Sequence, residues 1–252
     1  MIESLSLPEF PAGHVWLCGV GPGDAGLLTL HALNALKQAD VVVHDALIGA
    51  DILALARDGA EMVFAGKRGG QSATQAGISQ QLVTLAQSGK RVLRLKGGDP
   101  FMFGRGGEEA QLLAAHGIAF RVIPGISAGI GGLAAAGIPV THRDVNTAVT
   151  FVTGHDESVD WNAISKACEV IVIYMGLKRI GMIAKALLAA GRGADMPVAI
   201  VTDASLPTQR VLQTTLGMVE QDLAKHPMTP PAIICIGRNV SLRDVLKRGQ
   251  HG

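Results

Sequence analysis

Short apolar runs alternate with longer amphipathic segments along the first half of the chain. The runs are rich in Val and stop near Gly, Asp or Pro, which is typical of buried strands. They are HVWLCGV (14–20), ADVVVHD (39–45), AEMVFAG (60–66), KRVLRLKG (90–97) and FRVIPG (120–125). Segments with helical spacing lie between them, at 27–39, 51–59, 78–89 and 108–117, and most stop at Gly. The alternation predicts a mostly parallel α/β sheet.

The second half of the chain continues with strands and helices in a less regular order. A helix rich in small residues is expected at 126–139, and a second helix at 217–226. Strand-like runs lie at 147–155, 168–177, 196–205, 209–216 and 230–238. The spacing mixes hairpins with crossover connections. We therefore expect two α/β lobes, an N-terminal one over residues 1–124 and a C-terminal one over residues 125–252.

Composition excludes several classes of partner. At 252 residues, 48% hydrophobic and 17% charged, the chain has the balance of a globular protein with ample material for a core. A net charge of +1 and 4% aromatic residues disfavour binding to nucleic acid. No apolar run reaches the roughly 18 to 20 residues that span a bilayer, so no membrane association is expected. The eight histidines show no ligand spacing, and no metal is assigned.

Targeting and redox signals point to the cytoplasm. The first fourteen residues, MIESLSLPEFPAGH, contain no Lys or Arg and no apolar core, which does not fit a signal or transit peptide. Cys18, Cys168 and Cys235 form no CxxC pair, so reduced, buried thiols are expected.

The first strand ends in GVGPGD (19–24), which partly matches a dinucleotide-binding fingerprint. Asp45, at the end of the second strand, lies near the place where an acid contacts the ribose in such folds. However, Asp24 replaces the third glycine, and Pro22 removes an N–H group from a loop that would have to offer such groups to phosphate. The loop suits a ligand without phosphate, although a dinucleotide-binding oxidoreductase stays as an alternative from a different class.

The fourth strand ends in an even richer glycine loop, LKGGDPFMFGRGGEE (95–109). Gly97 and Gly98 allow close backbone approach to a bulky ligand, Asp99 suits an ammonium or hydroxyl group, and Pro100 fixes the turn. S-adenosylmethionine (SAM) has this character, because it carries a sulfonium, an ammonium and a ribose but no phosphate. A purely structural turn explains either loop, taken alone, equally well.

Several motifs in order give a more specific indication. They are VGPGDAGLLTL, ADVVVHDALI, VFAGKRGG, LKGGDPFMFGRGGEE, VIPGISAGIGGLAAAGIPVTHRD, VTGH, YMGL and PPAIICIGR. From about His14 to Leu246 the chain resembles the tetrapyrrole methylase family. The GGDPFMFGRGGEE and PVTHRD segments resemble the members that methylate uroporphyrinogen III, in their single-function form.

The resemblance implies a fold and an activity. The fold would be two α/β lobes with the cofactor in the cleft between them, assembled as a homodimer. The activity would be SAM-dependent methylation of uroporphyrinogen III at C2 and C7, giving precorrin-2 through precorrin-1 for sirohaem, cobalamin or haem d1. S-adenosylhomocysteine (SAH) would be the second product. Another SAM-dependent methylase of a tetrapyrrole precursor is the alternative.

The resemblance also implies roles for individual residues. Asp45 matches the proton acceptor and Lys67 the proton donor, and Arg105 joins them as a catalytic candidate; a solvated Asp and a surface Lys are the alternatives. The cofactor-binding candidates are Pro22, Gly97, Gly98, Asp99, Met102, Ser127, Ala128, Met175, Ala204 and Ala232. Without the family, Met175 would be interpreted as a core methionine. Ser127 stands where Thr is more usual.

The eight carboxylates of the substrate require a local cluster of cations in a chain of near-neutral charge. The loops offer Arg68 beside Lys67, Arg105, and His142 with Arg143. Glu108 is also a substrate-binding candidate, and it lies at the start of the helix that follows Arg105. A salt bridge between Arg105 and Glu108 at this helix start is the alternative role for the arginine. Ala46 follows Asp45 where relatives carry Arg, which puts one carboxylate contact in doubt.

Overall fold

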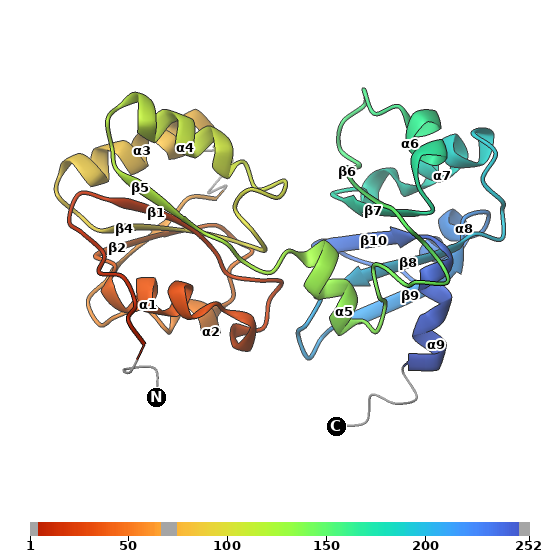
Figure 1. The fold of residues 1–252 in the computed structure, drawn as a ribbon, viewed down its shortest axis with the longest axis horizontal. Coiled ribbons are helices and arrows are strands. Elements are labelled where there is room, and N and C mark those ends of the chain that lie inside the picture. Colours follow the sequence, from red (N-terminus) through yellow and green to blue (C-terminus); the bar gives the residue numbers. More distant parts are fainter. Residues whose placement is uncertain (1–4, 67–74, 247–252) are drawn as a thin grey trace. The chain divides into compact units, whose positions relative to one another are not determined.

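A computed structural model describes residues 5–66 and 75–246 of the chain. The chain divides into two compact units, Met1–Ser127 and Ala128–Gly252, and each contains one five-stranded sheet (Figure 1). We call them the N-terminal and C-terminal units. The division falls just after the last strand of the first sheet, whereas the sequence analysis places it after residue 124.

The sheet of the N-terminal unit is parallel throughout, in the order β3-β2-β4-β1-β5. Its strands are β1 (Val15–Gly19), β2 (Val41–His44), β3 (Glu61–Phe64), β4 (Val92–Lys96) and β5 (Phe120–Ile123). All residues of β1 and β4 are buried, because helices cover both faces of the sheet. That double burial explains why these strands appear in the sequence as continuous apolar runs. The parallel α/β sheet predicted from those runs is confirmed.

Helices cover the two faces of this sheet in pairs (Figure 1). The helices are α1 (Leu30–Gln38) and α2 (Ala50–Leu53) on one face, with α3 (Gln75–Gln87) and α4 (Gly106–Ala115) on the other. Leu36 and Ile52 pack with Trp16 in the first core, whereas Leu82 and Leu113 belong to the second. Burial of apolar area on both faces is the main stabilising contribution here.

Two predicted helices of this unit are shorter than expected. A 3-10 turn at Ala25–Leu27 precedes α1, which begins after Thr29 because the Thr29 hydroxyl accepts the N–H of Ala32 (3.1 Å) and caps the helix. The helix expected at 51–59 ends at Leu53. The chain then turns, and the Arg57 guanidinium donates to the carbonyl of Ala39 (2.7 Å), which holds this segment against the end of α1.

The C-terminal unit has a mixed sheet in the order β6-β7-β10-β8-β9. Its strands are β6 (Val149–Thr153), β7 (Val170–Tyr174), β8 (Pro197–Thr202), β9 (Arg210–Thr215) and β10 (Ala232–Ile236). β6 and β7 are parallel, and the other three pairings are antiparallel. This arrangement matches the expected mixture of crossover and hairpin connections. β9 lies at one edge of the sheet.

The second unit also has a core on each face of its sheet. Its helical segments are a π-helical turn (Ala128–Gly132) leading into α5 (Leu133–Ala135), α6 (Trp161–Ala167), a 3-10 turn (Leu177–Arg179) leading into α7 (Ile180–Ala189), α8 (Val219–Lys225), and a 3-10 turn (Arg238–Ser241) leading into α9 (Leu242–Leu246). Trp161, Ile183 and Val219 pack in one core, and Leu133 and Val240 in the other. The segment expected to be a helix at 126–139 is therefore helical but irregular, and α6, α7 and α9 were not expected from the sequence. Within the described part of the chain, no helix is long and apolar enough to cross a bilayer.

Candidate functional site

Three glycine turns meet at the carboxyl ends of β1, β4 and β5 in the N-terminal unit. The N–H of Gly21 donates to the carbonyl of Gly98 (3.2 Å), and the N–H of Gly98 donates to the carbonyl of Gly21 (2.7 Å). A Cβ atom on Gly19 would lie 2.5 Å from the Gly98 oxygen and 2.6 Å from the Gly125 nitrogen. No side chain fits at such distances, so the three turns are in direct backbone contact. Parallel strands gather their carboxyl ends at one edge, which is where ligands bind in open α/β sheets.

The Asp99 carboxylate joins two of these turns. One oxygen accepts the N–H of Phe101 (2.8 Å) and the other accepts the N–H of Gly125 (3.0 Å). From the sequence, we expected this carboxylate to meet an ammonium or hydroxyl group of a ligand. In the structure both oxygens already accept backbone hydrogen bonds, so Asp99 has a structural role between β4 and β5. A carboxylate has about four acceptor positions, two on each oxygen. Each Asp99 oxygen accepts one of these backbone hydrogen bonds, so each can accept another.

The GVGPGD turn has few backbone donors for a phosphate group. The N–H of Val20 donates to the carbonyl of Lys96 (3.0 Å), and the N–H of Gly21 is used by Gly98. Pro22 has no N–H. The Asp24 carboxylate accepts the N–H of Gly26 (2.7 Å), which places a negative charge at the start of the following turn. This chemistry disfavours a pyrophosphate and suits a cofactor without phosphates.

Asp45, the candidate proton acceptor, directly follows β2 at this same end of the sheet. One carboxylate oxygen accepts the N–H of Leu47 (2.9 Å), and the other lies 3.7 Å from Nη2 of Arg94. The Asp45 side chain is 29% exposed, whereas that of Arg94 is 4% exposed. Asp45 is therefore a half-buried carboxylate beside a buried cation, which differs from the solvated aspartate that was the alternative.

A buried ion cluster lies behind Asp45. Glu109 of α4 is fully buried and accepts hydrogen bonds from Nε of Arg94 (3.2 Å) and from Nζ of Lys96 (3.0 and 3.1 Å to its two oxygens). Nε2 of Gln75 donates to the same carboxylate (2.9 Å). Burial lowers the pKa of Lys96, and the neighbouring Arg94 lowers it further, whereas Glu109 opposes the shift. We call Arg94, Lys96 and Glu109 the buried ion cluster.

This cluster was not among the sites expected from the sequence. The available signal was the presence of two cations at alternating positions, 94 and 96, inside an apolar strand. Residues two apart point to the same face of a strand, so both charges had to face the same core. Charged groups are almost never buried unless they are paired, and this predicts an acidic partner nearby.

Arg105 directly precedes α4 and adopts a left-handed backbone conformation with φ of 59°. Its Nε donates to the carboxylate of Glu108 (3.0 Å), and both side chains are more than half exposed. The hydrogen bond from Arg105 lowers the pKa of Glu108. The helix-start salt bridge weighed in the sequence analysis is thus present. An exposed pair of this kind contributes about 0 to 1 kcal/mol, so it does not explain why the backbone is held in a costly conformation.

Left-handed backbone conformations concentrate in the turns that carry candidate residues. The described non-glycine residues with positive φ are Phe103, Arg105, Met175, Asp203 and Ser205. Two lie in the turn after β4, and the others follow β7 and β8. Such residues cost of order 1 to 3 kcal/mol each and cluster at functional sites in known proteins.

In the C-terminal unit, four cofactor candidates lie close to the same ends of the central strands β7, β10 and β8. Met175 follows β7, Ala204 follows β8, and Ala232 begins the antiparallel strand β10 between them. Ala128 begins the π-helical turn, which the Tyr174 hydroxyl fixes by accepting the N–H of Gly129 (2.9 Å). Because Met175 is 55% exposed, its interpretation as a core methionine is wrong.

The remaining candidates are placed as follows. Pro22 and Met102 are half-buried in the turns after β1 and β4, and Ser127 is buried directly before the π-helical turn. His142 lies in the loop after α5, where its N–H donates to Asn146 (3.0 Å), and Arg143 beside it is exposed. Lys67 and Arg68 lie outside the described residues.

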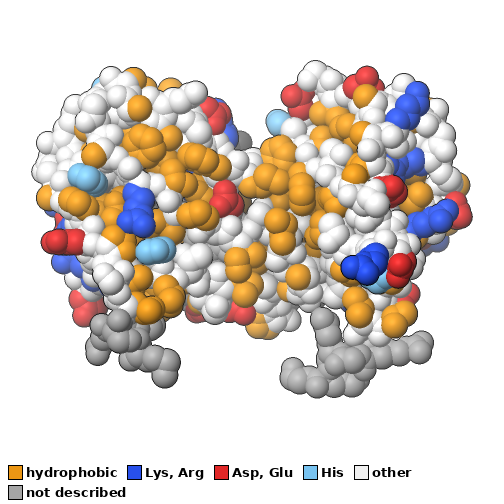
Figure 2. All heavy atoms as spheres, in the orientation of Figure 1, with side chains coloured by type: hydrophobic (Ala, Val, Ile, Leu, Met, Phe, Trp, Pro, Cys, Tyr) orange, Lys and Arg blue, Asp and Glu red, His pale blue; other side chains and the backbone are white. Residues whose placement is uncertain are grey.

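Large apolar side chains are exposed beside these turns. Leu47 is 62% exposed and Phe101 is 57% exposed in the N-terminal unit, and Ile130 is 55% exposed in the C-terminal unit. Figure 2 shows apolar side chains gathering on one face of each unit. Ligand sites are mostly apolar with a few placed polar groups, and these turns have that character.

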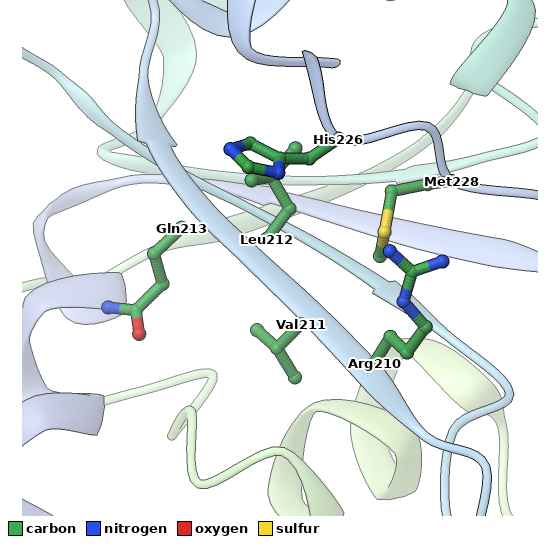
Figure 3. A pocket seen from close by; sticks show the side chains of 6 residues that line it. All are labelled: Arg210, Val211, Leu212, Gln213, His226 and Met228. Atoms are coloured by element: carbon green, nitrogen blue, oxygen red, sulfur yellow. The ribbon is translucent and has the colours of Figure 1, made fainter. Parts of the chain in front are cut away.

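A separate pocket lies along the edge strand β9. Its lining residues are Arg210, Val211, Leu212, Gln213, His226 and Met228 (Figure 3). Val211 packs on one core of the unit and Leu212 on the other, so the lining comes from both faces of the strand. None of these residues was a candidate from the sequence, and none lies in the turns described above. We do not assign the site to this pocket.

Comparison with known proteins agrees with these features. Residues 14–220 match the model of the tetrapyrrole (corrin/porphyrin) methylases. The chain is 58% identical to a uroporphyrinogen-III C-methyltransferase from Sinorhizobium sp., over 98% of this chain and 91% of that protein. It is 46% identical to a siroheme synthase from Thiobacillus denitrificans over 98% of its own length, but spans about half (52%) of that longer protein.

A solved structure agrees as well. The uroporphyrin-III C-methyltransferase of Thermus thermophilus, crystallised with S-adenosylhomocysteine, superposes with a TM-score of 0.80 at 38% identity, over 91% of this chain and 99% of that one. The chain belongs to the tetrapyrrole methylase family. The resemblance inferred from the motifs is confirmed at this level, and so is the two-lobed α/β fold.

Proposed function

We propose that the chain catalyses SAM-dependent methylation of uroporphyrinogen III at C2 and C7, giving precorrin-2 through precorrin-1, with SAH as the second product. The observation that carries the proposal is the set of interlocked glycine turns, in which the N–H groups of Val20, Gly21 and Gly98 already donate within the protein, because this suits a cofactor without phosphates. The 58% identity to the Sinorhizobium relative over nearly the whole chain supports the choice of substrate.

SAM supplies an electrophilic methyl group on its sulfonium. The residues proposed to hold it are Pro22, Gly97, Gly98, Asp99, Met102, Ser127, Ala128, Met175, Ala204 and Ala232. Their main task is to fix the two reactants in the geometry of an in-line displacement. Such positioning supplies roughly 7 to 11 kcal/mol of the barrier reduction, so the protein itself needs no strong nucleophile.

Removal of a proton is the step that requires a side chain. Attack by an electron-rich pyrrole carbon leaves a positive charge on the ring system, and a proton must then leave. We propose Asp45 as its acceptor, because the half-buried carboxylate directly follows β2, at the end of the sheet where the glycine turns lie. Lys67 is the proposed proton donor.

Substrate carboxylates are proposed to contact Arg105, with Arg68, His142 and Arg143 as further cations. Arg105 also stays the third catalytic candidate. Its guanidinium is more than half exposed, and the pair with Glu108 fixes its direction at the start of α4. A planar guanidinium binds a carboxylate through two parallel hydrogen bonds, which a lysine cannot reproduce.

The test is to incubate the purified protein with labelled SAM and freshly reduced uroporphyrinogen III and to follow methyl incorporation by mass spectrometry. We expect two successive methyl additions. Absence of transfer to this substrate, with transfer to another tetrapyrrole precursor, would favour the alternative methylase.

A binding measurement tests the cofactor class separately. We expect saturable binding of SAH by calorimetry and none of NAD or NADP. Tight nicotinamide binding without SAH binding would contradict the assignment and restore the oxidoreductase alternative.

We further propose that the protein works in the cytoplasm as a homodimer, without a metal and with no nucleic-acid or membrane partner. The three cysteines are free, and burial raises the pKa of Cys18 and Cys235 to about 12, which leaves these thiols unreactive in a reducing compartment. Sedimentation of the purified protein measures the oligomeric state. The end product among sirohaem, cobalamin and haem d1 depends on the enzymes that consume precorrin-2.

A further inference from the structure

We propose that the buried ion cluster positions the Asp45 carboxylate, with Arg94 as the positioning residue and Glu109 as its anchor. The inference rests on the proposed function, in which Asp45 accepts a proton. It adds buried residues to that site that are not among the candidates named from the sequence.

The three nitrogens of the Arg94 guanidinium face three different partners. Nε donates to Glu109 (3.2 Å), Nη1 donates to the carbonyl of Leu95 (3.1 Å), and Nη2 lies 3.7 Å from the Asp45 carboxylate. The guanidinium is planar and rigid, so fixing two of its nitrogens fixes the direction of the third. The side chain is only 4% exposed and packs inside the unit. Arg94 therefore presents Nη2 to Asp45 from a fixed position.

The charge balance favours Asp45 as the fourth member of this network. Arg94 and Lys96 are two buried cations, and Glu109 supplies only one compensating anion. A buried charge without a partner is costly, so the excess positive charge attracts the next carboxylate within reach. Among the described contacts of Arg94, that group is Asp45.

The other side of Asp45 is fixed locally. Its second oxygen accepts the N–H of Leu47 (2.9 Å). One oxygen is thus held by the turn after β2, and the other faces a cation that is itself anchored in the core. Catalytic groups must be held within fractions of an ångström of their productive geometry, and a second layer of contacts supplies that precision.

The same strand provides a matched control. Asp40 precedes β2 as Asp45 follows it, and it is bonded by Arg91 (2.8 Å) just before β4 and by Arg57 (2.6 Å). This second aspartate–arginine pair joins the same two strands where they begin, whereas Asp45 follows the end of β2 and Arg94 lies in the middle of β4. It should contribute to stability but not to the reaction.

The experiment is a double-mutant cycle on the methylation rate, using Arg94→Lys, Asp45→Asn and the combination of both. We expect Arg94→Lys alone to lower kcat for uroporphyrinogen III by at least about tenfold, because the lysine lacks the fork that reaches Glu109 and Asp45 together. In the Asp45→Asn background, Arg94→Lys should change kcat less than about twofold, because its effect acts through Asp45. SAH affinity should stay within about twofold of wild type in all variants.

A merely structural role gives a different result. In that case Arg94→Lys would lower kcat by the same factor in both backgrounds, and this outcome would overturn the inference. Wild-type-like kcat in Asp45→Asn would also overturn it, while leaving the proposed methylation intact. Failure of the wild-type protein to methylate uroporphyrinogen III would refute the proposed function instead. Arg91→Lys is the control, and its kcat should stay within about twofold of wild type.

Lys96→Met replaces Arg94→Lys if circular dichroism shows that the arginine variant does not fold. Removing one of the two cations leaves Glu109 and Arg94 as a one-to-one pair, and the Glu109 oxygen released by Lys96 attracts the guanidinium away from Asp45. We expect a lower kcat that again disappears in the Asp45→Asn background, and an equal loss in both backgrounds would overturn the inference.

Discussion

Replacing Glu109 by glutamine tests how the first unit tolerates its buried charges. The carboxylate is fully buried and accepts hydrogen bonds from Arg94, Lys96 and Gln75. The amide removes the negative charge and turns one acceptor oxygen into a donor group that faces donors. Arg94 and Lys96 then stay buried without their shared anion.

The expected cost follows from this loss of compensation. Removing one partner of a buried ion pair destabilises a protein by about 3 to 5 kcal/mol, because the charge left behind has no partner. With an m-value of about 2 kcal/mol/M, the urea midpoint should fall by about 1.5 to 2.5 M. Glu108→Gln is the matched control, because the adjacent carboxylate forms an exposed pair with Arg105 and should cost less than about 1 kcal/mol.

The assay can be restricted to the affected unit. The chain has two tryptophans, Trp16 in the N-terminal unit and Trp161 in the C-terminal unit. In a Trp161→Phe background, Trp16 alone reports unfolding, and it is buried and stacked on Phe10 with ring centroids 4.1 Å apart. A free energy of unfolding for Glu109→Gln within about 0.5 kcal/mol of the parent, measured in this way, would refute the charge-balance reasoning.

Three further predictions concern the turns and the control ion pair. Asp99→Asn should weaken SAH binding about tenfold by loosening the turn that reaches Gly125, and unchanged affinity by calorimetry would show that this contact does not shape the cofactor site. Arg105→Lys should lower kcat/KM for the tetrapyrrole about 10-fold to 100-fold with SAH affinity near wild type, whereas near-normal turnover would leave Arg105 only its pair with Glu108. The hydrogen bond from Arg91 holds the pKa of Asp40 well below its usual range, so its stabilisation is present above the unfolded-state pKa of about 3.9 and is lost as pH falls through the folded-state value. The free energy of unfolding of wild type, measured by urea denaturation, should therefore exceed that of Asp40→Asn by about 1 to 2 kcal/mol at pH 7. If this difference does not become smaller between pH 7 and pH 2, the linkage is contradicted.

The strands could be predicted well because the residues at and next to their ends determine where they begin and stop. Val92–Lys96, for example, is an apolar run that begins after a Gly-Lys-Arg turn and ends at Gly97, and the structure places β4 there. The same local information failed for residues 51–59. There the helical spacing continues past Leu53, but a hydrogen bond from Arg57 to the distant Ala39 turns the chain. Tertiary contacts of this kind override local periodicity.

The contacts among the glycine turns could be expected from turn chemistry, whereas the contacts that depend on packing could not. Glycines at 19, 98 and 125 mark turns from their sequence alone, and they meet because parallel strands end at one edge. The pairing of Glu109 with Arg94 and Lys96 requires knowing which face of α4 lies on which strand. The two acceptor contacts of Asp99 likewise depend on the separation of β4 and β5. Neither is encoded in a local pattern.

The strand order of the second sheet has a consequence for synthesis on the ribosome. β10 lies in the middle of the order β6-β7-β10-β8-β9, yet it is the last of these strands to be made. Until Ala232–Ile236 leaves the exit tunnel, β7 and β8 each have an unpaired edge, and such edges pair readily with other chains. The first sheet is complete once β5 has emerged, so it can fold while the second is still unfinished. Nascent chains that stall between β9 and β10 should therefore carry a folded N-terminal unit together with a C-terminal segment that is prone to aggregate.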